Sequence, residues 1–365
     1  MGTLSNEIVK FAGGDTTFFD AFQDYYFHYN TANGRGKLGT FSEGITLEEK
    51  SKKIHNAFFA EVEKRSGISR DGNVDAWAAN PNVIWAAFAV VNATINSVLP
   101  LTINPSIGRW TDLRFVDYGD VVHYRITPRT LYTTSLGAHG ERTTFRQKKF
   151  DGDLVLVPKE HIVTVFTDMY RVLAGKEDLA NFVRLVVISM ETEMTRDAMN
   201  ALNVGMAAGT YPAALSYTGA FDPVKLVQIS ETVQAYNFGS APIIMGVSTA
   251  LMKVLPDSTL GYREFVNGDA GSVMYLRDFY GYQLIQLPQV ANGDYTDFGL
   301  AMDPNTLYIV SPAMDKLVKG VVSNTLTNSN QFYDNADITQ NFTMRKDWDF
   351  QFASAAFGGM YKITD

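Results

Sequence analysis

The sequence has no cysteine among its 365 residues. This absence excludes disulfide frameworks, thiolate metal sites and cysteine-based catalysis, and it fits a chain made in the cytoplasm. Basic residues are in the minority, because 31 of them stand against 39 acidic residues and give a net charge of −8. A dedicated DNA-binding surface over the whole molecule would need the opposite sign of charge.

Long hydrophobic runs are also lacking. The most apolar stretch, Val83 to Val91, is too short to span a bilayer and leads into polar residues. The N-terminus does not have the composition of a signal peptide. We therefore expect neither a membrane span nor contact with a membrane.

Chemical motifs are scarce. Residues 34–39 (GRGKLG) match the letters of a dinucleotide-binding loop, but no buried strand precedes them and no helix follows directly. Residues 71–75 (DGNVD) resemble the start of a calcium loop, but Ala76 stands where the turn glycine belongs. The five histidines are scattered and form no metal-binding pair. We expect no catalytic residue, no cofactor and no metal.

What the sequence does contain is a long amphipathic helix, predicted over residues 177–204. Gly205 follows at the position of a left-handed C-terminal cap, and the helix would be about 42 Å long. One face is apolar and is expected to pack on a sheet. Its apolar residues recur at every third or fourth position: Leu179, Phe182, Val183, Val186, Val187, Met190, Met194, Ala198 and Leu202.

The segment before residue 103 is predicted to hold an arm and two helices. Residues 1–43 combine clustered aromatics with glycines, so we interpret them as an extended segment that gains order by lying on another surface. Thr46 and Glu49 form a capping box that begins a helix running to about Arg65. Pro81 begins a second helix, apolar nearly all round, that runs to about Leu99.

Period-two alternation indicates β structure over residues 103–168. Two β-rich arms flank a polar tip at 128–150, as in a long two-stranded projection that must lie against a neighbour to be stable. This tip is the one basic part of an acidic chain, because residues 125–149 carry six basic residues and one acidic residue, a net charge of +5. The basic residues are Arg125, Arg129, Arg142, Arg146, Lys148 and Lys149.

An α/β segment is predicted at residues 212–330, after the long helix. Asp222 and Pro223 begin a helix in it, and residues 314–322 fit either a helix or a strand. Residues 342–363 return to β character, with Trp348, Phe350 and Phe352 on one face. The strands expected within the α/β segment lie at 242–247, 281–287 and 307–310.

This order of elements resembles the major capsid protein of tailed bacteriophages, which has the Hong Kong 97 fold. Residues 242–255 (PIIMGVSTALMKVL) resemble a strand and helix of that family's axial domain, and residues 281–288 (GYQLIQLP) resemble a later strand of it. Residues 345–363 resemble the closing strands of its peripheral domain. The resemblance covers nearly the whole chain.

The resemblance implies an α+β, Hong Kong 97-like capsid fold with an N-terminal arm, an extended β-hairpin loop, a long spine helix, and peripheral and axial domains. The domains would be 1–102 for the arm and helices, 103–168 for the extended loop, 169–211 for the peripheral domain with the spine helix, 212–330 for the axial domain and 331–365 for the returning peripheral strands.

The implied function is structural and not enzymatic. Copies would assemble through hexamers and pentamers, in the host cytoplasm, into the icosahedral head shell of a tailed bacteriophage virion. The shell would enclose double-stranded DNA without sequence-specific binding, and mild acidity would keep it from holding its genome too tightly. A portal is the expected partner, with scaffolding or decoration proteins as further candidates. We call the stretch of about 100 residues before the extended loop the leader, and we expect it to stay uncleaved.

Two alternatives stay open at this point. An encapsulin-like bacterial compartment has the same fold and holds cargo enzymes, although those chains are usually shorter and carry no comparable leader. A soluble homo-oligomeric α+β enzyme would instead form small oligomers around a polar pocket with perturbed titratable groups.

Overall fold

The computed structural model describes most of the 365 residues. Within the described part, the chain is helical up to residue 107, mostly β between 111 and 167, and mixed after a second long helix. This order agrees with the α+β class expected from the sequence. The described residues are 6–32, 44–70, 76–77, 79–108, 110–117, 119–127, 148, 151–167, 179–206, 212–254, 278–287, 289–291, 298–328 and 340–364.

The long helix predicted at the centre of the chain is α7 (Leu179–Gly205). Its predicted apolar face is the buried face, and Val183, Val187, Met190 and Met194 are each at most 2% exposed. The side chains of this face join one core that extends from Phe22 near the N-terminus to Ile363 near the C-terminus. The apolar periodicity of the sequence therefore located the element that organises the fold.

Gly205 has a different role from the predicted left-handed cap. It is the last residue of α7 and does not lie among the glycines with positive φ. A Cβ atom at this position would overlap the side chain of Phe352, whose Cδ1 atom would be 2.5 Å away. The glycine is therefore required for close approach of α7 to a strand, and not for its own backbone conformation.

The N-terminal segment is helical where it is described, which corrects the prediction of an extended arm. Helices α1 (Asn6–Phe11) and α2 (Thr17–Ala32) pack into the protein, and Phe22, Tyr25 and Tyr26 are buried in the main core. The aromatic residues recur every three or four positions, so they form the stripe of an amphipathic helix. Residues 1–5 and 33–43 lie outside the described residues.

Helix α3 (Leu47–Ser66) has the predicted capping box of Thr46 and Glu49, and its C-terminus is capped by Gly67 in the left-handed conformation. A buried ion pair joins α3 to α2, with Lys50 Nζ 3.0 Å from Asp24 Oδ2 and both side chains 4% exposed. Burial lowers the pKa of Lys50, against the opposing effect of Asp24.

Helix α5 (Pro81–Ile107) begins at Pro81 as predicted but continues past Leu99. Pro100 lacks an N–H group and costs the helix one hydrogen bond, yet full burial of Ile95, Val98 and Leu99 holds the helix together across it. The stretch Pro81–Thr102 is long and apolar enough to cross a membrane, which corrects the expectation from the shorter run. Because 72% of an 18-residue window of this stretch is buried inside the protein, core packing accounts for its apolarity.

A four-stranded sheet covers these helices, in the order β1-β10-β11-β4. Trp348 and Phe350 of β11 point into the core beside α7, as their predicted common face requires. The strands are β1 (Thr111–Val116), β4 (Lys159–Thr167), β10 (Val318–Asn328) and β11 (Gln340–Phe352).

A second sheet has six strands in the order β5-β12-β9-β6-β8-β7. Helix α8 (Pro223–Tyr236) packs on it, and Asp222 caps α8 by accepting hydrogen bonds from the N–H groups of Val224 and Lys225. The other elements are η2 (Ala213–Leu215), β5 (Ser216–Gly219), β6 (Ile243–Gly246), α9 (Ser248–Met252), β7 (Asp278–Phe279), β8 (Tyr282–Gln286), β9 (Thr306–Val310) and β12 (Gly359–Ile363).

Strand pairing crosses the boundaries of the expected domain division at two places. Strand β10, expected within the axial segment 212–330, pairs with β1 and β11 in the four-stranded sheet. Strand β12, expected among the peripheral strands of 331–365, pairs with β5 and β9 in the six-stranded sheet. The chain thus passes between the two sheets twice after residue 310, and the division itself stays a prediction.

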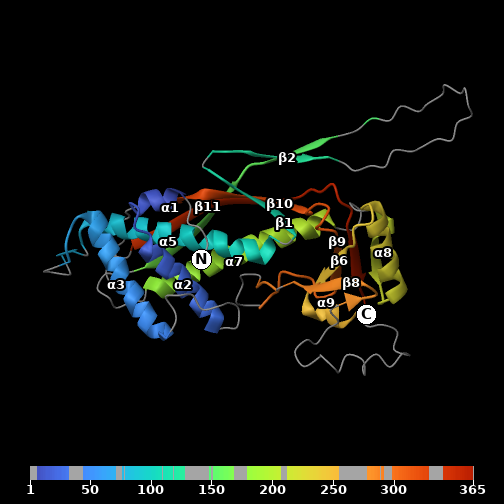
Figure 1. Cartoon of the computed structure of the whole chain (residues 1–365), viewed down its shortest axis with the longest axis horizontal. Coiled ribbons are helices and arrows are strands. Elements are labelled where there is room, and N and C mark those ends of the chain that lie inside the picture. Colours follow the sequence, from blue (N-terminus) through green and yellow to red (C-terminus); the bar gives the residue numbers. More distant parts are fainter. Residues whose placement is uncertain are drawn as a thin grey trace, which may run out of the picture.

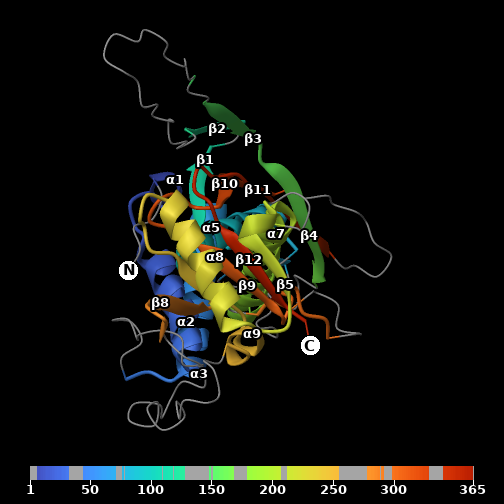
Figure 2. The same ribbon diagram turned by 90° about the vertical axis from the view of Figure 1, so that its right-hand side faces the viewer.

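The four-stranded sheet lies along the long helices, and the six-stranded sheet lies at one end of an elongated molecule (Figure 1). Helices α1, α2, α3 and α5 gather around one end of α7, while α8, α9 and the six-stranded sheet lie at its other end. Viewed from that end, α8 crosses the six-stranded sheet with β8 on one side and β5 on the other (Figure 2). Helix α7 therefore links both parts of the subunit.

Candidate functional site

The predicted projection begins as a two-stranded ribbon of β2 (Val122–Ile126) and β3 (Gly152–Leu156). The strands are antiparallel, with Val122 opposite Leu156 and Ile126 opposite Gly152. The start of the predicted β segment is corrected, because α5 continues to residue 107 and β1 belongs to the four-stranded sheet. Residues 128–147 and 149–150, which hold most of the predicted tip, lie outside the described residues.

One face of this ribbon rests on the subunit's own sheet. Val122, Tyr124 and Leu156 form a small buried cluster with Val321 of β10. The hydroxyl of Tyr124 lies 3.0 Å from the carbonyl oxygen of Asp112 and 2.7 Å from that of Gly320, so it donates toward both. Burial, and next the charge of Asp112, raises the pKa of Tyr124. The direction in which the ribbon leaves the body is therefore fixed at its base.

The opposite face of the ribbon is exposed and carries both pairs of polar or charged side chains and apolar side chains. Arg125 Nη2 lies 2.8 Å from Asp151 Oδ2, and His123 Nδ1 lies 3.0 Å from Asp153 Oδ2. Three exposed valines accompany these pairs: Val121, Val155 and Val157. An exposed ribbon face with this mixture is typical of a surface that contacts another chain.

The structure describes two of the six predicted contact residues. Arg125 is exposed and paired with Asp151, so part of its charge is already offset within the subunit. Lys148 is exposed. Asp151 and Asp153 lie just beyond residues 125–149, over which the charges were counted. Sequence reasoning therefore missed that these two acidic residues face the base of the basic segment. The remaining four, Arg129, Arg142, Arg146 and Lys149, lie outside the described residues.

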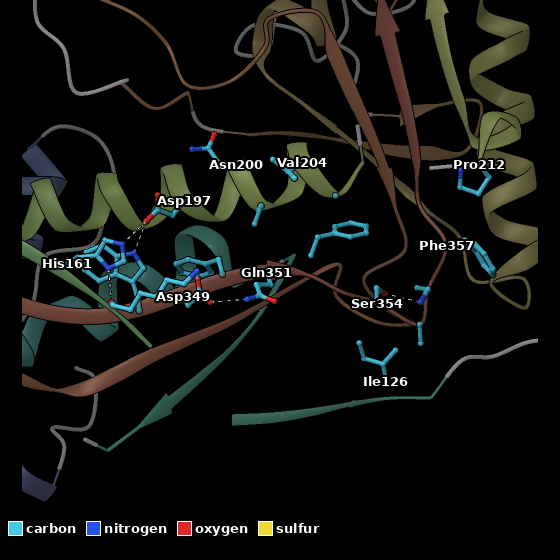
Figure 3. Close-up of a pocket in the computed structure, with 18 residues that line it drawn as sticks. Ile126, His161, Asp197, Asn200, Val204, Pro212, Asp349, Gln351, Ser354 and Phe357 are labelled. Carbon is cyan, nitrogen blue, oxygen red and sulfur yellow. Dashed lines mark hydrogen bonds and ion pairs between the residues drawn. The ribbon is translucent and has the colours of Figure 1, made fainter. Parts of the chain in front are cut away.

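A groove of about 970 Å³ lies between the end of the ribbon, the C-terminal half of α7 and the end of β11 (Figure 3). Asp197, Asn200 and Val204 line it from α7, and Asp349 and Gln351 line it from β11. Ile126, at the end of β2, lies across from them.

Three elements meet at one end of this groove through His161, Trp348 and Asp197. The rings of His161 of β4 and Trp348 of β11 stack at 3.8 Å with an interplanar angle of 4°. Trp348 Nε1 donates to Asp197 Oδ2 over 2.9 Å, and His161 Nε2 lies 3.4 Å from the same oxygen. Burial alone would raise the pKa of Asp197, but the hydrogen bonds from His161 and Trp348 outweigh it and lower the pKa.

The remaining polar groups of the groove are also engaged with one another. Lys159 Nζ lies 3.0 Å from Asp349 Oδ1, and Gln351 donates to the other oxygen of that carboxylate over 3.1 Å. The lining hydroxyl, Ser354 Oγ, donates to Asp315 Oδ2 and not to a histidine. These contacts join β4, β11 and α7, which is a structural role.

Sequence reasoning missed this cluster because its members are far apart in the chain. His161 is one of five histidines that are scattered along the sequence. Asp197 lies on the polar side of α7 among other charged residues. Only the pairing of β4 with β11, which sets Lys346 opposite His161, brings the histidine beside Trp348. The periodicity of a sequence does not determine which residues of two distant strands lie opposite each other.

Comparison with protein families decides the class of this chain. The model of the family described as "SPbeta prophage-derived putative capsid protein YonB" matches residues 34–361. The chain belongs to this family. A search of curated proteins finds no match.

Among solved structures, this capsid protein is similar to the mature capsid of bacteriophage PhiM1, at 12% identity and a TM-score of 0.47, covering 70% of this chain and 86% of that one. For the capsid of a native GTA particle the identity is 11% and the TM-score 0.47, covering 71% and 90%. For the structure of Mycobacterium phage Bobi the identity is 13% and the TM-score is 0.45, and the match covers 72% of this chain and 90% of that one. The family assignment rests on the family match alone.

The family assignment confirms the expected class of function. The protein is a capsid protein with an α+β fold, and its place is the capsid of the virion. It has a structural role and is not an enzyme. The encapsulin-like alternative is not favoured, because the matching family is one of prophage capsid proteins.

Proposed function

We propose that copies of this chain assemble through hexamers and pentamers into an icosahedral head shell around double-stranded DNA of a tailed bacteriophage. The observation that carries the proposal is the capsid-family match over residues 34–361. The net charge of −8 supports enclosure of DNA without tight binding, because a shell of this sign repels the phosphate backbone on average. Assembly in the host cytoplasm, with a portal and with scaffolding or decoration proteins as partners, belongs to the same proposal.

Electron microscopy of the purified protein tests the proposal directly. Closed particles tens of nanometres across are expected, and nuclease-protected double-stranded DNA is expected in particles from infected or induced cells. Compact rings or dimers alone would contradict shell formation. Particles that contain a cargo protein in place of DNA would favour a compartment.

The basic segment of the projection is proposed to dock on an acidic surface of a neighbouring subunit. Its residues are Arg125, Arg129, Arg142, Arg146, Lys148 and Lys149. The ribbon leaves the body above the four-stranded sheet (Figure 1), and its base is held by Tyr124. One exposed ion pair contributes only about 0–1 kcal/mol, but a shell repeats the contact in every subunit.

Reversing four charges together tests this contact. The quadruple variant with Arg142, Arg146, Lys148 and Lys149 changed to Glu is expected to stay folded but to assemble poorly, and higher salt should restore assembly by screening the new repulsion. Normal shells at low salt would refute the contact.

A matched control reverses four exposed lysines of helices α1 and α3, which gives the same change in net charge. We expect this control to assemble, and failure of both variants would show an effect of net charge alone. The four control lysines are Lys10, Lys52, Lys53 and Lys64.

The leader is proposed to remain in the mature shell. Helices α2, α3 and α5 share the main core with α7, and the hydroxyl of Tyr26 donates to Glu191 of α7 over 3.2 Å. Cleavage near residue 100 would expose the apolar face of α7 to water, at a large free-energy cost. N-terminal sequencing of mature particles tests this, and a start near residue 100 would contradict it.

A further inference from the structure

Three exposed aromatic residues of the described part have a backbone conformation that suits glycine. Phe238, Tyr280 and Phe298 have φ values of 56°, 48° and 49°, and they are the non-glycine residues with positive φ in the described ranges. Their side chains are 50%, 64% and 81% exposed. A bulky residue in this region is strained, and exposure of the ring gains no burial within the subunit. Backbone strain at such places commonly serves a contact with another molecule.

Tyr280 gives the sharpest case because of its turn. Strands β7 and β8 are joined by Tyr280 and Gly281, which both have positive φ, as in the two-residue turn that favours Asn, Asp or Gly at its first position. The buried ring of Phe279 meets the ring of Tyr280 edge to face at 4.8 Å. The turn thus holds an aromatic ring outside the sheet, where a small polar residue would fit the backbone better.

Phe238 lies on the same flank of α8 as this turn. The side chain of Gln234 donates to the carbonyl oxygen of Gly239 over 3.2 Å, and it accepts from the hydroxyl of Tyr282 over 3.2 Å. Gln234 therefore ties the turn that contains Phe238 to the β7–β8 hairpin. We call Phe238 and Tyr280 together the aromatic knob.

The opposite flank of α8 carries a groove of about 630 Å³ between α8, η2 and β5. Positions on α8 that line it recur every three or four residues, so they form one side of the helix. Strand β5 ends the six-stranded sheet on this side, and β7 ends it on the other. Figure 2 shows β8 and β5 on opposite sides of α8. The groove residues used below are Ala213, Tyr217, Lys225, Gln228, Thr232 and Ala235.

We propose that the aromatic knob of one copy inserts into the α8–β5 groove of the next copy. A knob and a groove on opposite flanks of one subunit make a head-to-tail contact, and such contacts generate rings when the rotation closes. Lys225 and Glu231 both line the groove, and Asp278 is exposed beside the knob, so Lys225 can pair with Asp278 across the contact, while Glu231 leaves the groove without a net charge. The inference rests on the proposed self-assembly and names the surface that joins neighbouring copies.

Engineered disulfides test the pairing cleanly, since the chain has no cysteine of its own. Assembled particles of the Tyr280→Cys, Ala235→Cys double variant are expected to give a ladder of covalent multimers on a non-reducing gel after mild oxidation. Each single variant should stay monomeric, and a mixture of the two should stop at dimers. Dimers of Tyr280→Cys alone would show a two-fold contact and overturn the proposal.

Failure of the inference and failure of the proposed function give different results. If wild-type protein forms no particles, shell assembly itself is refuted. If wild-type and double-variant particles form but no cross-link appears, only the knob-in-groove contact is refuted. If the double variant forms no particles, a mixture of the Tyr280→Asn and Ala235→Trp variants decides. The Ala235→Trp variant keeps its knob and the Tyr280→Asn variant keeps its groove, so one subunit of each kind can still bind the other. Discrete dimers are therefore expected, whereas monomers alone would overturn the proposal.

Relief of strain separates a contact role from a structural role. Tyr280→Asn suits the turn, so the melting temperature of the unassembled subunit should stay equal or rise. The protein concentration needed for assembly should rise at least about tenfold, as for the loss of an aromatic anchor. Tyr280→Phe keeps the ring and should assemble like the wild type. A lower melting temperature with unchanged assembly would show that Tyr280 serves the subunit alone.

Discussion

Substitution of Gly205 by alanine should destabilise the subunit, against the usual trend for helices. Glycine within a helix is less stable than alanine by roughly 0.5–1 kcal/mol. Here the new Cβ would overlap the Cβ and Cγ atoms of Phe352 and lie 2.5 Å from Cδ1. Because the Cβ of Phe352 is fixed to the backbone of β11, rotation of the ring cannot relieve the overlap. Overpacking costs up to about 3 kcal/mol, so we expect a net loss of about 2 kcal/mol.

Urea unfolding of the unassembled subunit, followed by circular dichroism, measures this change. Gly152→Ala in β3 is the matched control, because its Cβ would make ordinary contacts at 3.7 and 3.8 Å with Ile126. The control should change the free energy of unfolding by less than about 0.5 kcal/mol. Equal stability of the Gly205→Ala variant and the wild type would refute the argument from close approach.

A double-mutant cycle distinguishes the two explanations for this glycine. If Phe352 is the cause, Gly205→Ala should be close to neutral or stabilising in a Phe352→Gly background, because the overlapping Cβ, Cγ and Cδ1 atoms are then all gone. If a left-handed backbone were the cause, the penalty would persist in that background. The coupling free energy between the two sites is therefore the decisive quantity.

Three further predictions concern the buried face and the internal ion pairs. Met190→Asp places an unpaired charge in the core and should prevent folding, so that no soluble subunit is recovered. Asp24→Leu leaves the Lys50 ammonium buried and should cost about 3–5 kcal/mol in urea unfolding, whereas the Asp24→Leu, Lys50→Met double variant should recover most of that loss. The pKa of Asp197 is lower in the folded state, so its contribution to stability is present above its unfolded pKa and is lost as pH falls through the folded value. The stability difference between wild type and Asp197→Asn should therefore shrink below a pH of about 4, and a difference independent of pH would contradict this.

The features that the sequence predicted well are those that a local pattern determines. The capping box of Thr46 and Glu49 involves residues three positions apart, and it forms as expected. The start of α5 at Pro81 and the buried face of α7 follow from turn chemistry and helical period in the same way. The ribbon of β2 and β3 was predictable because alternation marks its first strand and a β-rich run, Leu154 to Val157, marks its second.

The features that the sequence could not predict depend on contacts between distant segments. Local composition could not show that β12 pairs with β5, or that β10 joins β1, because either strand fits either sheet by its pattern. The role of Gly205 depends on Phe352. The aromatic stripe of α2 was in principle readable, but neighbouring glycines made an extended segment look equally reasonable. The surfaces on both flanks of α8 required the positions of the turns in space.

Burial separates the parts of the subunit that must form before assembly from the part that can adapt during it. Helices α2, α3, α5 and α7 share one continuous core, so loss of the leader would remove partners from the helix that links both ends of the molecule. The ribbon, in contrast, is held by a cluster of four buried residues and by the hydroxyl of Tyr124. A small anchor fixes the direction of the projection but adds little stability beyond it. Its exposed face can therefore be completed by a neighbouring subunit at low cost, because few internal contacts have to break first.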